Sequence, residues 1–204
     1  MERTARREQV LACARSVFSR RGYHATTVSD IIEEAGVARG TFYLYFKSKR
    51  SIFDELLDEY LRAILAQVRR VDLGPAAEPP VRQVLGNVER ILAVLLESTE
   101  MSRILFHEAV GLDADFDRKL AEFYGEIVKL AQGSLRLGQQ MGLVRDCDVR
   151  VAALCIVGAV KEVVDAASAG PGALPDQRAL SREIMRFLDG VFVPAALAGL
   201  EDQP

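Results

Sequence analysis

A short segment near the N-terminus carries side chains that can bind phosphates and the edges of nucleic-acid bases. If residues 39–46 form a helix, Phe42 and Phe46 lie on its buried side, at i and i+4. The side left toward solvent or a ligand then carries Arg39, Gly40, Thr41, Tyr43 and Tyr45. Guanidinium and hydroxyl groups hydrogen-bond phosphates and base edges. These residue types predict contact with DNA.

The preceding residues predict the elements that would position this helix. Thr27 and Asp30 form a helix-start signal, and Val28, Ile31, Ile32 and Ala35 follow as a buried stripe. Gly36 suits the tight turn that ends the helix, and Val37 would fill the core beneath it. Two short helices joined in this way predict a helix–turn–helix, whose second helix enters the major groove.

Two amphipathic helices joined at a glycine also occur in proteins that bind no nucleic acid, so the charge distribution matters. Residues 1–50 contain ten Lys and Arg against five Asp and Glu, a net charge of +5. The other residues contain sixteen against twenty-four, a net of −8. A basic first quarter on an acidic chain favours phosphate binding by one end of the molecule.

The same residues carry a resemblance to a known family. The chain resembles the DNA-binding domain of tetracycline-repressor (TetR) family regulators over about residues 5–57. The resemblance is carried by Gly22-Tyr23-His24-Ala25-Thr26-Thr27, Ile31-Ile32-Glu33-Glu34-Ala35-Gly36-Val37 and Gly40-Thr41-Phe42-Tyr43-Leu44-Tyr45-Phe46-Lys47-Ser48-Lys49. It implies an all-helical homodimer that binds a palindromic double-stranded operator and releases it when a small molecule binds the C-terminal domain.

The resemblance also implies roles for individual residues. Thr27 would cap a helix whose N-terminus faces a backbone phosphate, and Lys49 would bind phosphate. Arg39 and Thr41 would reach bases or phosphates, and Gly40 would allow close approach. Leu44 would touch a thymine methyl, and Tyr43 and Tyr45 would contact phosphates or thymine methyls. Arg50-Ser51 departs from the family pattern, in which an acidic residue often follows the lysine, and suggests a further phosphate contact.

The whole chain is expected to be all-α, with an N-terminal three-helix head (residues 1–50) and a larger helical domain for effector binding and dimerisation (residues 51–204). The first helix is predicted at about 5–21, and a connector helix at about 48–71 ends before Gly74-Pro75. Further helices are expected at about 81–97, 101–110, 115–140, 148–168 and 176–193.

The last two helices are predicted to form the dimer interface. The run 151–160 is apolar on every side, and the final helix carries Leu180, Ile184, Phe187, Leu188, Val191 and Phe192 before Pro194. A helix that is apolar all round must be buried all round, which favours a four-helix bundle shared by two copies. An ordinary central helix within one subunit is the alternative.

An effector pocket is expected among the helices at 81–140. Apolar walls with one or two polar groups suit a small hydrophobic effector. The candidate residues are Leu92, Leu96, Arg103, Phe106, His107, Phe123 and Tyr124. Simple packing of these side chains into a core is the alternative for each of them. Without a cavity, the chain would be a DNA-binding dimer without small-molecule input, constitutive or controlled by a protein partner.

Catalytic and metal motifs are incomplete, so no enzyme, cofactor or metal is expected. His107-Glu108 lacks the second histidine of a zinc-protease motif, because Gly111 stands in its place. Asp113, Asp115 and Asp117 begin like a calcium loop but lack its glycine and glutamate, and are expected to cap the next helix. The sequence predicts a cytoplasmic protein without membrane contact. Its three cysteines lack CxxC spacing, no apolar run is long enough for a bilayer, and no signal peptide is recognised.

Overall fold

The fold is all-α in the computed structural model, which describes residues 2–168, 177–188 and 190. This architecture confirms the predicted fold class. The helices are α1 (Glu2–Ala25), α2 (Val28–Ala35), α3 (Arg39–Tyr45), α4 (Lys49–Leu65), α5 (Pro80–Glu97), α6 (Thr99–Arg103), the π-helical turn η1 (Ile104–Glu108), α7 (Ala114–Gln140), α8 (Val149–Ser168) and α9 (Gln177–Leu188).

The head consists of α1, α2, α3 and the start of α4 around an aromatic and aliphatic core. Phe18 of α1, Phe42 of α3 and Phe53 of α4 are almost fully buried. The rings of Phe18 and Phe53 meet edge to face, with 5.2 Å between their centres. Gly22 takes φ 77° within α1, which bends the last turn of that helix toward α2. This shared core joins α2 and α3 to α1 and α4.

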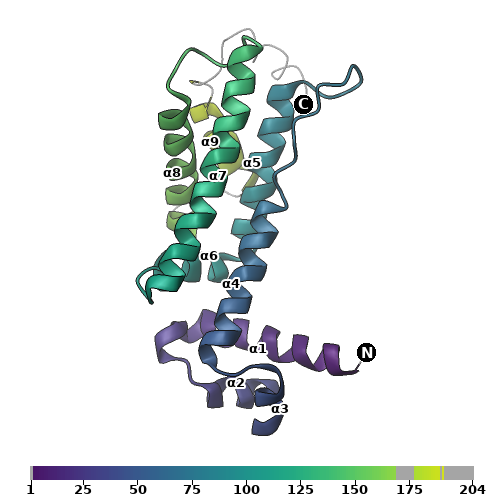
Figure 1. Ribbon diagram of the computed structural model, residues 1–204, viewed down its shortest axis with the longest axis vertical. Coiled ribbons are helices and arrows are strands. Elements are labelled where there is room, and N and C mark those ends of the chain that lie inside the picture. Colours follow the sequence, from purple (N-terminus) through teal and green to yellow (C-terminus); the bar gives the residue numbers. More distant parts are fainter. Residues whose placement is uncertain (1, 169–176, 189, 191–204) are drawn as a thin grey trace.

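The body stands on the head, and α4 runs from one into the other (Figure 1). The long helix α5 packs beside α4, and α7 and α8 pack against each other, while α6 and η1 lie at the end of the body next to α1. Arg103 at the end of α6 donates a hydrogen bond to the carbonyl of Ser19 in α1. The body therefore touches the head at α6 as well as through α4.

The connector helix ends at Leu65, six residues earlier than the predicted end at 71. Side chains of α5 replace its helical hydrogen bonds. The amide of Asn87 bonds both the N–H (2.9 Å) and the carbonyl (2.8 Å) of Arg69, and Arg90 donates to the carbonyl of Gln67. These partners lie about twenty residues further along the chain, so the period of the local sequence could not reveal them.

Two other helices differ from their predicted bounds. The segment predicted as one helix at 101–110 is divided into α6 and η1, where the N–H of Ala109 bonds the carbonyl of Ile104 across a wider turn. The final helix is described as α9 up to Leu188, while Val191, Phe192 and Pro194 lie outside the described residues. Asp113 caps α7 by accepting from the N–H groups of Asp115 and Phe116, as predicted.

Candidate nucleic-acid interface and ligand cavity

A reciprocal cap and a left-handed glycine set the angle between α2 and α3. The Thr27 hydroxyl accepts from the Asp30 N–H, and the Asp30 carboxylate accepts from the Thr27 N–H at 2.7 Å. These bonds from Thr27, supported by Arg21, lower the pKa of Asp30. Gly36 takes φ 60°, and its N–H and that of Val37 close the end of α2. The predicted start and turn are both present.

One face of α3 is exposed and rich in the residue types expected at a DNA interface. Tyr43 and Leu44 are 45 % and 59 % exposed, and the Arg39 guanidinium lies 5.8 Å from the Tyr43 ring centre. A Cβ at Gly40 would meet no atom within 4 Å, so another molecule's backbone has room to approach there. On the opposite side, Phe42 and Phe46 anchor the helix in the core.

The remaining sequence-predicted contacts are partly engaged within the head. Thr41 and Tyr45 are half-buried, and the exposed Thr27 is occupied with its cap. The Lys49 ammonium donates a hydrogen bond to the backbone carbonyl of Tyr23 at 2.7 Å. It also lies 4.3 Å from the centre of the Tyr23 ring. Lys49 thus joins α4 to the end of α1.

Internal ion pairs reduce the number of cations that the head offers to a phosphate. On α1, Arg20 pairs with Glu34 at 2.7 Å and Arg21 with Asp30 at 2.6 Å. Arg7 and Arg15 also pair, with Glu55 and Glu59 of α4. The net charge of the segment therefore overstates its basic surface.

One residue of the DNA-binding motif departs from its predicted role, and a second has no predicted role. Arg50, expected as a further phosphate contact, lies 2.7 Å from Asp113 and 3.2 Å from Asp115 at the start of α7. Lys47, to which no role was assigned, is exposed between α3 and α4, and no ion pair is found for it among the described residues. The position of Lys47 directly after the recognition helix is the sequence feature that indicates a phosphate contact.

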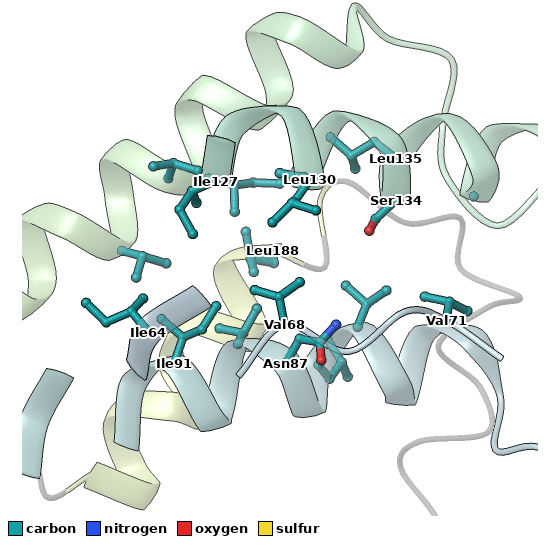
Figure 2. Close-up of a pocket in the computed structure, with 18 of the residues that line it drawn as sticks. Ile64, Val68, Val71, Asn87, Ile91, Ile127, Leu130, Ser134, Leu135 and Leu188 are labelled. Atoms are coloured by element: carbon teal, nitrogen blue, oxygen red, sulfur yellow. The ribbon is translucent and has the colours of Figure 1, made fainter. Parts of the chain in front are cut away.

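The body encloses a cavity of about 180 Å³, room for on the order of a dozen water molecules. Its walls come from the end of α4 and the segment after it, from α5, η1, α7 and α8, and from Leu188 of α9. Figure 2 shows Ile127, Leu130 and Ser134 of α7 facing Ile64, Val68 and Asn87 across the space. The walls are overwhelmingly aliphatic and aromatic.

The two ends of the cavity differ in their access to solvent. At the end nearest the head, Leu105 and Phe106 of η1 and Phe123 of α7 are each less than 9 % exposed. At the other end, Met141 is 42 % exposed, and Leu130, about midway between Phe123 and Met141, is 41 % exposed. The α7 residues from Phe123 to Met141 span about 27 Å at 1.5 Å per residue. The cavity is therefore elongated, with a closed end toward the head and a mouth at the far end.

Few polar side chains reach this apolar space. They are Asn87, Tyr124, Ser134 and Lys161. Asn87 is committed to the backbone of Arg69, whereas the Tyr124 hydroxyl is buried and has no hydrogen-bond partner among the described residues. Burial raises the pKa of Tyr124, with a further contribution from the charge of Asp165. The Lys161 ammonium lies 5.3 Å from the centre of the Phe106 ring.

The sequence-predicted pocket residues are only partly brought together. Phe106, Phe123 and Tyr124 line the closed end, whereas Leu92 and Leu96 pack in the core beside it. Arg103 points to α1 of the head, and the side chain of His107 lies outside what the structure describes. The helix α8, outside the predicted pocket segment, also forms a wall of the cavity, and Lys161, a cation after a long apolar run, is the sequence signal that marks it.

The described residues form neither a metal-binding cluster nor a membrane-spanning helix. Over the described ranges, no group of three or more His, Cys, Asp or Glu side chains is arranged to hold a metal ion. None of the helices described is both long and apolar enough to span a membrane. The α3 face and the body cavity are therefore the two candidate sites.

Comparison with known proteins places these features in one family. A family model described as bacterial regulatory proteins, tetR family, matches residues 10–56. The HTH-type transcriptional repressor KstR2 of Rhodococcus jostii is 31 % identical over 160 residues, 74 % of this chain and 74 % of that protein. The uncharacterized regulator YdgC of Bacillus subtilis is 28 % identical over 188 residues, 89 % of this chain and 90 % of that one.

The fold agrees with that of a solved transcriptional regulator over nearly its whole length. The transcriptional regulator FadR of Bacillus subtilis, solved in complex with stearoyl-CoA, aligns with a TM-score of 0.74 and 26 % identity, covering 90 % of this chain and 98 % of that chain. Both the N-terminal segment and the helical body are therefore shared with transcriptional regulators. The chain belongs to the TetR family of transcriptional regulators.

Proposed function

We propose that this regulator is a homodimeric repressor that leaves a palindromic operator when an acyl thioester binds its body. The elongated apolar cavity with one closed end carries this proposal, because it suits a long apolar chain. FadR of Bacillus subtilis was solved with stearoyl-CoA, a ligand of this chemical class. The cavity also favours this function over a DNA-binding dimer without small-molecule input.

The exposed side of α3 supports operator binding. Arg39, Tyr43 and Leu44 lie together on the surface, while the buried Phe42 fixes the helix from behind. Arginine and tyrosine can bind base edges and phosphates, and the leucine can pack on a thymine methyl. Thr27, Gly40, Thr41, Tyr45 and Lys49 complete the proposed contact set, and Lys47 is added as a phosphate contact.

The mouth of the cavity suits the charged part of such a ligand. Val68 and Val71 line the cavity, and the two residues between them, Arg69 and Arg70, are exposed. Asn87 holds the backbone of Arg69 on both sides, so this segment is well positioned. The apolar chain would enter the cavity while phosphate groups remain outside beside these arginines.

The closed end supports coupling between ligand and operator. Leu105 and Phe106 of η1 line that end, and the adjoining α6 reaches the head through Arg103 and the Ser19 carbonyl. The α7 wall also reaches α4, through Arg50 with Asp113 and through Lys119 with Asp58 at 2.7 Å. A bound acyl chain that displaces η1 or α7 would thereby change the angle between the head and the body.

Exposed apolar residues on α8 and α9 support the dimer. Val151, Leu154 and Phe187 are 56 %, 51 % and 67 % exposed. Cys155 and Gly158 extend the exposed stripe on α8 at helical spacing. A second copy packed on this face would bury it, and two recognition helices would then read two half-sites.

Selection of sites from random duplex DNA, followed by titration with stearoyl-CoA, tests the function. We expect a palindrome with half-sites about one helical turn apart, weaker binding by Tyr43→Ala, and release by stearoyl-CoA. Phe187→Asp should raise the dimer dissociation constant at least tenfold by sedimentation, whereas Leu73→Asp, at a similarly exposed residue away from α8, should not. Selection of no motif by a folded dimer would exclude the proposal.

A further inference from the structure

Two tyrosines that are largely buried in the body differ in what their hydroxyl groups contact. The Tyr60 hydroxyl on α4 lies 2.6 Å from Ser102 Oγ, and Ser102 in turn donates to the Leu95 carbonyl at 2.7 Å. The Tyr124 hydroxyl is equally inaccessible to solvent but has no such partner in the described part of the chain. Since buried polar groups are nearly always hydrogen-bonded, the Tyr124 hydroxyl requires an explanation.

The position of Tyr124 points to a ligand as the missing partner. Tyr124 lines the closed end of the cavity together with Phe106 and Phe123. From Tyr124 to Met141 at the mouth is about 25 Å along α7. A hydroxyl donor thus lies at the end of the cavity that the far end of a bound chain would reach.

A lysine ammonium lies at the same end, on the helix that also carries Asp165, whose charge acts on Tyr124. Lys161 lines the cavity from α8, and its ammonium lies 5.3 Å from the centre of the Phe106 ring. Cations and hydroxyl donors both favour a ligand oxygen, and their attraction is stronger in a space from which water is excluded. Purely aliphatic walls would have suited a saturated chain better.

We infer that the ligand carries a hydroxyl or keto oxygen at its buried end, and that Tyr124 donates a hydrogen bond to it. This inference rests on the proposed function and specifies the ligand class as an oxygenated acyl thioester. Without ligand, a water molecule can satisfy the tyrosine hydroxyl. A saturated chain displaces that water without replacing its bond, whereas an oxygenated chain replaces it.

Calorimetry with matched pairs of thioesters tests the inference. The probes are saturated acyl-CoAs of twelve to eighteen carbons and their counterparts hydroxylated on the terminal carbon. At the length that reaches Tyr124, the hydroxylated member should bind about tenfold more tightly, equivalent to about 1.4 kcal/mol. Tyr124→Phe, which keeps the ring, should remove this preference. Tyr60→Phe is the matched control and should keep it, because Tyr60 does not line the cavity.

Lys161→Met provides a second variant that does not depend on Tyr124. This substitution keeps much of the apolar side-chain length but removes the charge. It should reduce, but not abolish, the preference for the hydroxylated thioester. Thermal unfolding of Tyr124→Phe should match the wild type, since the substitution removes a hydroxyl that bonds no described group.

The possible outcomes separate the inference from the function on which it rests. Equal or tighter binding of the saturated member at every length overturns the inference but leaves a ligand-responsive repressor. A preference that survives in a folded Tyr124→Phe protein also overturns it. If none of these thioesters binds, the proposed ligand class fails, and the inference fails with it.

Discussion

The guanidinium of Arg50 lies 2.7 Å from the carboxylate of Asp113, joining the first turn of α4 to the cap of α7. Asp113 also accepts the N–H groups that begin α7, and Arg50 lies 5.2 Å from the centre of the Phe116 ring. One residue of the DNA-binding motif is therefore held by the helix that forms a wall of the cavity. Under the proposed function, this contact is a direct route from ligand to operator.

Arg50→Gln should weaken the communication between the two sites with little effect on stability. The Arg50 and Asp113 side chains are 48 % and 35 % exposed, so the free energy of unfolding in urea should fall by less than about 1 kcal/mol. The factor by which saturating stearoyl-CoA lowers operator affinity should become smaller. Arg136→Gln is the control, because Arg136 is exposed on α7 away from Asp113 and Asp115. An unchanged factor in Arg50→Gln would exclude this route.

Lys47→Ala should weaken operator binding about equally for all operator sequences. The exposed Lys47 follows the recognition helix and is proposed to contact a phosphate, so its removal should lower the slope of log affinity against log salt by about 1. The control is Lys129→Ala, since Lys129 is exposed on α7 of the body. If both variants show the wild-type slope, Lys47 is not a phosphate contact.

Ser134→Phe should give a repressor that binds its operator but no longer responds to ligand. Ser134 faces the cavity from α7, and a phenyl ring there would occupy the path of an acyl chain (Figure 2). Operator affinity without ligand should stay within about twofold of wild type, because the head is untouched, while stearoyl-CoA binding falls at least tenfold. Arg136→Phe places the same ring on an exposed position of α7. If stearoyl-CoA released Ser134→Phe from the operator as it releases the wild type, the cavity would not be the ligand site.

Asp30→Asn should destabilise the head at neutral pH but not in acid. The bonds from Thr27 lower the folded-state pKa of Asp30 below its ordinary value of 3.8, so the charged carboxylate is favoured in the folded protein. Its stabilising contribution is therefore present above that value and is lost as the pH falls through the lower folded-state pKa. Unfolding midpoints of wild type and variant should converge across this range. A difference between the two midpoints that stayed constant with pH would contradict the cap's dependence on charge. The control is Asp146→Asn, since Asp146 is exposed.

Local sequence determined the head and most of the helices. The Thr27–Asp30 cap, the Gly36 turn and the Phe42–Phe46 pair each depend on residues within four positions of one another. Interactions of this range follow directly from helical geometry, so spacing alone predicts them. The same reason explains why Asp113 could be expected to cap α7.

Tertiary structure decided where the connector ends, which cations remain available and which residues form the cavity. Asn87 and Arg90 of α5 bond the backbone of the residues that follow α4, where the connector helix was predicted to continue. Arg50 and Lys49 contact residues far from them in the sequence. The cavity joins α4, α5, η1, α7, α8 and α9, so apolar spacing on any one helix cannot distinguish its wall from a filled core. Such contacts depend on how the helices pack, and only the folded chain brings Tyr124 and Lys161 to the same closed end.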